Sequence, residues 1–246
     1  MNENRIIRRR HLPHIDVEDK PVFITACLDG SIPATSLKRI REYRDALNQK
    51  PRPENLSEAD WELKKHKLVF KFVDSILDGD CPVTHLADER LAKIVQDAFL
   101  HFAGERYQLF AFVVMPSHHH WLFLPDTDWA EKFAVSQIGK TKRSTPRESI
   151  SHSIQSYTGN QCNKVLGVSG AFWQSETFDH YVRDEDELAR IIQYVEQNPV
   201  VAGLVGSADE YRWSSAHLRR QLGLTRDQAI PKMTLEHATH DRIRNT

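Results

Sequence analysis

Residues 112–125, with the sequence FVVMPSHHHWLFLP, constrain the fold of this chain more than any other stretch. Apolar and β-branched residues run up to Met115, a Pro-Ser pair follows, and a second apolar run begins with His118. Two apolar runs separated by so short a turn signal predict adjacent strands that are tightly joined. We therefore expect a sheet organised around this pair of strands.

Three consecutive histidines, His118, His119 and His120, open the second of these strands. Side chains alternate between the faces of a strand, so His118 and His120 project from one face about 7 Å apart at Cα, and His119 projects from the other. Two imidazoles on one face can share a metal ion. The alternative is that they are polar residues at a strand end, hydrogen-bonded and inert, and spacing alone does not choose between these interpretations.

The rest of the chain predicts further strands and helices. A β-rich run at residues 21–28 predicts the first strand, and aromatic alternation at residues 171–182 predicts the last. Residues 126–146 are polar and are expected to form a loop. Apolar spacing and end signals predict helices over residues 35–50, from 57 to before Gly79, 86–102, 146–165 and 184–198, the last halted by Pro199.

This order of elements predicts the fold class. With residues 30–80 set aside as a helical insertion, the order is strand, helix, strand, strand, helix, strand, helix. That is the split βαβ order, so we predict an α+β fold of the ferredoxin-like type, an antiparallel sheet with helices on its faces. We expect this domain over residues 21–218, after a flexible basic arm at residues 1–20 and before a basic tail at residues 219–246.

Composition narrows the class of protein. A chain of 246 residues with 40% hydrophobic content can bury one substantial core. Its 3 cysteines form no Cys-x-x-Cys pair, which argues against a disulfide framework or a thiolate zinc site. No secretory signal is visible, and no apolar run approaches the roughly 20 residues that a membrane helix needs. We therefore expect a cytoplasmic protein with no membrane partner.

The net charge of -1 excludes a protein that is polycationic as a whole, so a nucleic-acid surface would depend on local clusters. A solvated surface is the alternative for each such cluster. The candidate DNA contacts are Arg5, Arg8, Arg9 and Arg10 in the arm, and Lys140, Lys142, Arg143 and Arg147 further along the chain.

The last predicted helix carries a second candidate group. Tyr194 and Asn198 are four residues apart, so they lie about 40° apart on one flank of the apolar stripe. Taken alone, Tyr194 is a tyrosine at the edge of the core, with its ring packed against apolar residues and its hydroxyl in water. Asn198, directly before Pro199, is by itself a helix stop. The pair gains meaning only beside the two histidines.

Two segments together resemble a known family. Residues 112–125 look like the His-hydrophobic-His strand of the single-tyrosine HUH transposases. The run GAFWQSETFDHYVRDEDELARIIQYVEQNPVVAGLV at residues 170–205, followed by YRWSSAH at residues 211–217, is similar to the tail of the REP-associated tyrosine transposases. Either segment alone is a weak signal, but both in this order, on the expected strand and helix, are specific.

The resemblance implies roles for four residues. His118 and His120 would hold a divalent metal, Mg²⁺ or Mn²⁺, with Asn198 as the third protein ligand, and Tyr194 would be the nucleophile. The implied activity is that of a metal-dependent single-strand DNA endonuclease and strand transferase. It would act at DNA hairpins such as REP palindromes through a 5′-phosphotyrosine intermediate, as a monomer or a homodimer.

Two alternatives stay open. One is a domesticated protein that binds hairpin DNA and no longer cuts it. The other is a small metallohydrolase that uses His118 and His120 on a non-nucleic substrate, although no third histidine or carboxylate is identifiable at matching spacing. The sequence also leaves the role of the helical insertion open, and His119 stands where the family usually has an apolar residue.

Overall fold

The centre of the molecule is a four-stranded sheet in the order β4-β5-β3-β6, with every neighbouring pair antiparallel. The computed structural model describes residues 6–9, 13–16, 20–77, 79, 81–141, 143–175 and 177–232. The strands are β3 (Val22–Cys27), β4 (Tyr107–Val114), β5 (His118–Pro125) and β6 (Phe178–Tyr181). With the predicted insertion set aside, one long helix separates β3 from β4 and another separates β5 from β6, and this order confirms the predicted ferredoxin-like α+β fold.

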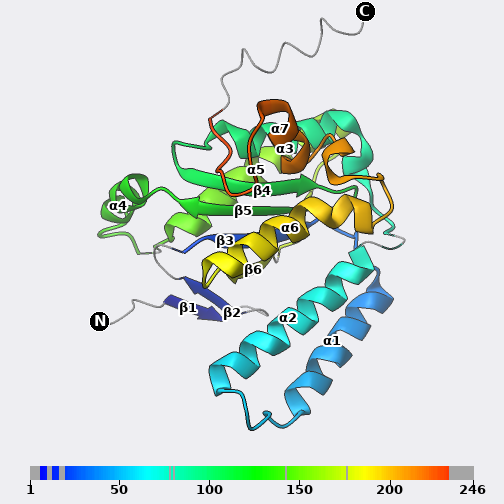
Figure 1. Cartoon of the computed structure of the whole chain (residues 1–246), viewed down its shortest axis with the longest axis vertical. Helices are drawn as coiled ribbons and strands as arrows, with labels where there is room; N and C mark the ends of the chain where they lie inside the picture. Colours follow the sequence, from blue (N-terminus) through cyan, green and yellow to red (C-terminus); the bar gives the residue numbers. More distant parts are fainter. Residues whose placement is uncertain are drawn as a thin grey trace, which may run out of the picture.

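Helices cover both faces of the sheet (Figure 1). Helix α6 (Glu185–Val201) crosses one face, and α3 (Glu89–His101) and α5 (Pro146–Leu166) lie on the other. The alternation along β5 explains why both faces are apolar. Trp121 belongs to the core beneath α3 and α5, whereas Leu122 belongs to a second core with residues of α6. A side chain on β5 therefore faces α6 or α3 according to its position in the alternation.

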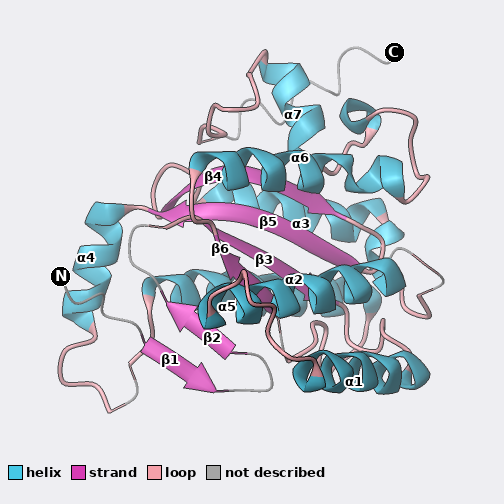
Figure 2. Cartoon of the chain, turned by 60° about the horizontal axis from the view of Figure 1, so that its bottom comes forward, coloured by secondary structure: helices cyan, strands magenta, loops and turns pink. Residues whose placement is uncertain are grey.

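The predicted insertion is a pair of packed helices, α1 (Ala34–Gln49) and α2 (Glu58–Leu77), which we call the α1–α2 lobe. The signal that starts α2 is confirmed, because the Asp60 backbone N–H donates to Ser57 Oγ at 3.1 Å. Figure 2 shows α2 running beside the sheet, with α1 farther out. The lobe forms the lower end of the molecule in Figure 1.

A buried carboxylate on α6 ties the lobe to the rest of the protein. Glu187 is 2% exposed and accepts hydrogen bonds from Lys67 of α2 and from the backbone N–H and Nε of Arg183, the latter two at 3.0 and 3.2 Å. Burial alone would raise the pKa of Glu187. The hydrogen bonds from Lys67 and Arg183 outweigh burial and lower the pKa to about 2.

We expect replacement of Glu187 by Gln to remove a pH-dependent part of the stability. A depressed carboxyl pKa stabilises the fold above the unfolded value of 4.5, and this contribution is lost as the pH falls toward about 2. This contribution of the Glu187 carboxylate is about 2 kcal/mol, a value reduced because its partners Lys67 and Arg183 are half exposed and solvent screens the interaction. In urea unfolding, Glu187→Gln should lose less stability than the wild type between these pH values. The exposed neighbour Glu185→Gln is the control, and equal pH slopes in the wild type and Glu187→Gln would contradict the assignment.

Two predicted boundaries in the second half of the chain differ from the structure. Residues 126–146, expected as a loop, contain α4 (Thr127–Ser136), which begins because Asp126 accepts a hydrogen bond from the Trp129 backbone N–H at 2.9 Å. Pro199 does not halt α6 but lies inside it, and the helix runs on to Val201. A proline so close to the end of a helix removes one backbone donor and leaves the other turns intact.

The ends of the chain differ from expectation as well. The arm expected to be flexible contains two paired strands in its described part, β1 (Ile6–Arg9) and β2 (Pro13–Asp16). The expected tail does not begin at residue 219, since α7 (Ser215–Leu222) runs across that point. Ile230 makes an antiparallel bridge with Leu109 of β4, so the domain extends to this residue. Within the part of the chain that the structure describes, none of the helices has the length and apolar character needed to cross a membrane.

Candidate active site

The structure brings together the four residues to which the resemblance assigns roles. His118 and His120 lie on one face of β5, and Tyr194 and Asn198 lie on α6, which crosses that face. Strand β5 pairs with β4 and β3 on its two sides, so its backbone is fixed. The ring centroids of His120 and Tyr194 are 5.5 Å apart, and Asn198 Nδ2 is 3.3 Å from His120 Nε2.

Two hydroxyl groups orient the imidazole rings. Ser117 Oγ lies 3.0 Å from Nδ1 of His118, and Thr25 Oγ1 of β3 lies 2.6 Å from Nδ1 of His120. When these oxygens accept the Nδ1 protons, both Nε2 atoms carry lone pairs. The two Nε2 atoms face each other at 3.2 Å. A cation bound by both nitrogens would convert this repulsive arrangement into a ligand pair.

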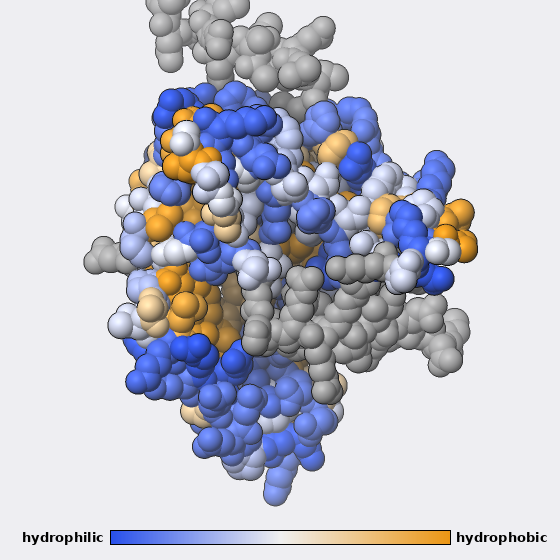
Figure 3. Space-filling view, turned by 180° about the vertical axis from the view of Figure 1, so that it is seen from behind, coloured by the Kyte–Doolittle hydropathy of each residue, from blue (hydrophilic) through white to orange (hydrophobic). Residues whose placement is uncertain are grey.

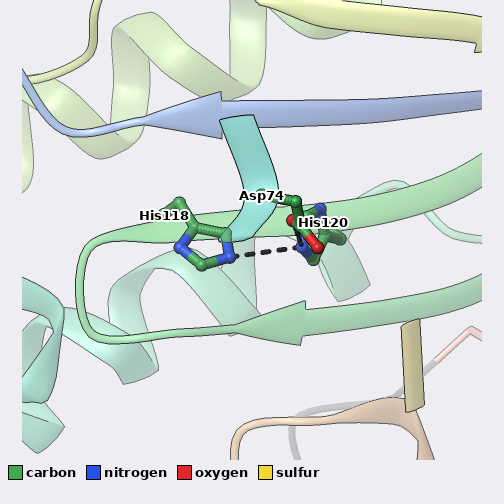
Figure 4. A group of neighbouring side chains, drawn as sticks. All are labelled: Asp74, His118 and His120. Atoms are coloured by element: carbon green, nitrogen blue, oxygen red, sulfur yellow. Dashed lines mark hydrogen bonds and ion pairs between the residues drawn. The ribbon is translucent and has the colours of Figure 1, made fainter. Parts of the chain in front are cut away.

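Asp74 is a further donor, which the sequence analysis did not name. It lies on α2, and its Oδ1 is 3.3 Å from His120 Nε2 (Figure 4). Its Oδ2 accepts a hydrogen bond from the hydroxyl of Tyr194. Ligand atoms of Asp74, His118 and His120 all lie within 4.8 Å of one another. One carboxylate thus faces both the histidine pair and the tyrosine.

A signal for Asp74 was present in the sequence. Its neighbours one turn before and one turn after on α2 are Phe70 and Leu77, which are apolar, so Asp74 lies on the apolar face of that helix. It is 8% exposed there. A buried carboxylate almost always has a partner. The sequence did not show which element the helix would cover, and therefore did not show the partner.

Asn198 fits the role of a metal ligand after a simple rotation. Its Oδ1 is buried and has no hydrogen-bond partner among the described residues, whereas its Nδ2 faces His120 Nε2. Turning the amide by 180° exchanges the two atoms in place and directs the oxygen at the histidines. In the turned orientation the amide oxygen would lie with two imidazoles and a carboxylate, a set of donors that can hold a cation.

The distances among these donors suit one octahedral ion. Ligands about 2.1 Å from such an ion and at right angles to each other lie about 3 Å apart. The observed separations from His120 Nε2 are 3.2 Å to His118 Nε2, 3.3 Å to Asp74 Oδ1 and 3.3 Å to the Asn198 amide. The residues present therefore fit a divalent cation held by nitrogen and oxygen donors.

Burial and neighbouring charge set the protonation of this group. Burial raises the pKa of Asp74, but the hydrogen bond and charge of His120 and the hydrogen bond from Tyr194 outweigh it, so the pKa lies below its ordinary value. Burial, and then the charge of His120, hold the pKa of His118 well below its ordinary value. The site thus favours a carboxylate and a neutral imidazole, the forms that bind a metal.

His119 faces the opposite side of the sheet, as the alternation predicts. Its ring centroid lies 5.1 Å from that of Phe99 and 4.8 Å from that of Trp173, inside the core under α3 and α5. Burial and the charge of His120 lower its pKa to about 3, so it is neutral. Its Nδ1 has no hydrogen-bond partner in the described part of the chain. His119 therefore packs as an aromatic core residue.

The predicted DNA contacts fall into different surroundings. Arg5, Arg10 and Lys142 lie outside the described residues, Arg8 and Arg9 are described only as backbone of β1, and Lys140 and Arg143 are exposed between α4 and α5. Lys140 lines a hollow of about 570 Å³ beside α5, together with Arg106 and His152. Glu148 and several serines line the same hollow, so its surface is polar and carries charges of both signs.

Arg147 differs from this expectation and is corrected. Its side chain is buried, and its Nη1 lies 2.9 Å from Oδ2 of Asp179 on β6. A buried guanidinium that is neutralised by a carboxylate joins α5 to the edge strand and presents no surface to a phosphate. We therefore leave Arg147 out of the DNA surface.

Comparison with known proteins bears on the resemblance. No family model matches the chain. A curated protein of Haemophilus influenzae, provisionally named a REP-associated tyrosine transposase, is 28% identical over 112 residues, which are 45% of this chain and 60% of that protein. The resemblance to the REP-associated tyrosine transposases is confirmed. The chain covers less than two thirds of the length of the Haemophilus influenzae protein.

One solved structure is also similar to the chain. It is described as a REP-associated tyrosine transposase bound to a REP hairpin. The two chains are 16% identical, with a TM-score of 0.45 over 89% of this chain and 90% of the other. The fold assignment here rests on the strand order and pairing of this chain and does not depend on that likeness.

Proposed function

We propose that this protein is a metal-dependent single-strand DNA endonuclease and strand transferase with Tyr194 as its nucleophile. The observation that carries the proposal is the double contact of Asp74, which accepts a hydrogen bond from the Tyr194 hydroxyl and faces His120 with its other oxygen. A phenolic oxygen thus lies beside donors that fit a divalent cation. The similarity to a REP-associated tyrosine transposase supports a transposase-like reaction on DNA, and we propose hairpin DNA as the substrate.

The residues divide the chemistry among them. His118, His120, Asn198 and Asp74 would hold Mg²⁺ or Mn²⁺, which when bound draws charge from the scissile phosphate and aligns it. The Tyr194 oxygen forms a bond to phosphorus, and the bond from phosphorus to the 3′ oxygen breaks. The products are a 5′-phosphotyrosine and a free 3′-hydroxyl. One phosphoester replaces another, so the reverse step joins the strand to another 3′ end without an energy source.

The donors of this site are buried more deeply than the tyrosine. His118 and His120 are 0% exposed and Asn198 is 2% exposed, whereas Tyr194 keeps part of its surface open. Asp74 approaches His120 from α2 (Figure 4). In this proposal Asp74 would stay with the cation and give up only its hydrogen bond to the Tyr194 hydroxyl when a phosphate enters beside the tyrosine.

Replacement of Asp74 by Asn tests its place among the ligands. The change keeps the shape and removes the carboxylate charge, so we expect the affinity for Mn²⁺ to fall by about 10- to 100-fold. Isothermal titration with MnCl₂ measures this directly, without DNA. The exposed Asp45→Asn on α1 is the matched control. An unchanged Mn²⁺ affinity in Asp74→Asn would remove Asp74 from the ligand set.

The experiment that tests the function uses a labelled hairpin oligonucleotide with single-stranded flanks. Its sequence would come from a search of the DNA beside the gene for short repeated palindromes, and it is incubated with the protein and Mn²⁺. A labelled band that stays with the protein on a denaturing gel supports the proposal. Binding on a native gel without such a band supports the non-cleaving hairpin binder instead. We also propose that the protein acts in the cytoplasm.

The metallohydrolase alternative gains one feature from the structure. Asp74 supplies the carboxylate that the sequence did not offer at matching spacing. The contact of that carboxylate with Tyr194 and the similarity to the transposase relative favour the DNA reaction over it.

A further inference from the structure

We propose that a pocket between the α1–α2 lobe and the sheet holds one base of the single strand, in the nucleotide next to the scissile phosphate. The inference rests on the proposed function and deepens it. The pocket has a volume of about 320 Å³ and is bounded by α1, α2, β3 and the chain around the start of β6. Its apolar walls are Ile32, Ile40, Val69, Phe70, Val73 and Phe178.

Two stacked phenylalanines give the pocket an aromatic wall. The rings of Phe70 and Phe178 lie 4.2 Å apart between centroids, with an interplanar angle of 28°. Bases of single-stranded DNA stack on such side chains, and this stacking tolerates different sequences because every base has an aromatic face. Gln174 and Thr177 also line the pocket and bring polar groups that suit the edge of a base.

The pocket is continuous with the proposed reaction centre. Thr25 lines it, and the hydroxyl of Thr25 also contacts Nδ1 of His120. The Phe70 ring centroid is 6.2 Å from that of His120 and 5.8 Å from that of Tyr194. Asp74 follows Phe70 by one helical turn. A base in the pocket would therefore leave its own phosphate within reach of Tyr194.

The charge at the pocket fits a nucleotide better than a purely apolar occupant. Arg41 and Arg44 of α1 line the same pocket, and Arg41 is exposed. A base between apolar walls with its phosphates against guanidinium groups satisfies both parts of the surface. Figure 3 shows apolar surface directly above the hydrophilic lower end that the lobe forms. A lipid tail or an apolar peptide would bring no phosphate to the exposed guanidinium of Arg41.

Abasic substitution separates base binding from phosphate binding. The probe is a fluorescent hairpin oligonucleotide with a single-stranded flank, bound to Tyr194→Phe so that it is not cut. Each flank nucleotide in turn is replaced by an abasic one, and affinity is measured by fluorescence anisotropy. We expect one position at which the missing base weakens binding by roughly 5- to 100-fold.

Two variants connect that position to the pocket. Ile40→Trp fills the pocket. In this variant, the probe that lacks the base at that position should bind as tightly as the probes that lack a base at neighbouring positions. Arg41→Ala should reduce the slope of log affinity against log salt concentration by about one unit. Lys38→Ala, which removes a charge from an exposed position of the same helix outside the pocket, is the control for both measurements.

Failure of the pocket proposal and failure of the proposed function give different results in these experiments. Equal affinity for all abasic probes, or an unchanged pattern in Ile40→Trp together with an unchanged salt slope in Arg41→Ala, would overturn the pocket and leave the proposed function standing. Failure of the intact probe to bind at all would count against the function as well. Circular dichroism tests whether each variant is folded. If Ile40→Trp does not fold, the salt dependence of Arg41→Ala decides whether the pocket binds the strand.

Discussion

Tyr194→Phe is expected to abolish the covalent protein–DNA product while leaving hairpin binding intact. The substitution keeps the ring, whose centroid lies 6.0 Å from that of Phe23 and 5.8 Å from that of Phe70, and removes only the oxygen that would attack phosphorus. Loss of a nucleophile lowers the rate by at least about 1000-fold. Denaturing gels of labelled hairpin with Mn²⁺ measure the adduct, and native gels measure binding.

An exposed tyrosine provides the matched control for this experiment. Tyr157 on α5 is 55% exposed and lies outside the group of ligands, so Tyr157→Phe should form the adduct at the wild-type rate. Adduct formation that persists in Tyr194→Phe would move the nucleophile to another residue. Loss of hairpin binding in Tyr194→Phe would mean that the hydroxyl serves the fold or the DNA contact instead.

Removal of the metal or of a histidine ligand should have an effect of similar size. EDTA is expected to stop cleavage, and His120→Ala should lower the affinity for Mn²⁺ by at least about 100-fold, because it removes the donor that lies beside all the others. In the wild type, Mn²⁺ at about 100 times its dissociation constant should stabilise the fold by about 2.7 kcal/mol. Thermal unfolding with and without MnCl₂ measures this gain, which His120→Ala should lack.

A histidine away from the site controls for nonspecific binding of the ion. His101 is exposed on α3, so His101→Ala should keep both the Mn²⁺ affinity and the gain in stability. Cleavage that resists EDTA would contradict the metal requirement. An Mn²⁺ affinity in His120→Ala that equals the wild-type affinity would contradict the role of the histidines and would leave their close approach as a feature of packing alone.

Local periodicity accounts for what could be predicted from the sequence. Strand alternation placed His118 and His120 on one face and His119 on the other, and helical spacing placed Tyr194 and Asn198 on one flank. Both patterns depend on neighbours within a few residues. The order of elements predicted the sheet, because few topologies are compatible with it. Which face α6 would cover came from the family resemblance.

The features that the sequence did not show depend on contacts over long distances. Asp74 meets Tyr194 across 120 positions, and no local pattern shows which strand α2 will cover. Arg147 belongs to a basic stretch, and only the folded chain reveals the carboxylate of Asp179 beside it. Pro199 carries a local signal for a helix end, but the helix continues to Val201; Pro199 is buried there and its carbonyl accepts a hydrogen bond from the Leu204 backbone N–H at 2.9 Å, contacts that a local signal does not show.

The pocket wall and the proposed metal ligands come from different parts of the fold, so one can change in sequence while the other is kept. Strand pairing to β3 and β4 positions the histidines, whereas the walls contributed by α1 are made by side chains outside the sheet. In the proposed function, substitutions on α1 would alter how tightly a base is held without disturbing the reaction centre. Asp74 would limit this freedom, because a different lobe that lacked a carboxylate at the same place would leave the proposed ligand set incomplete.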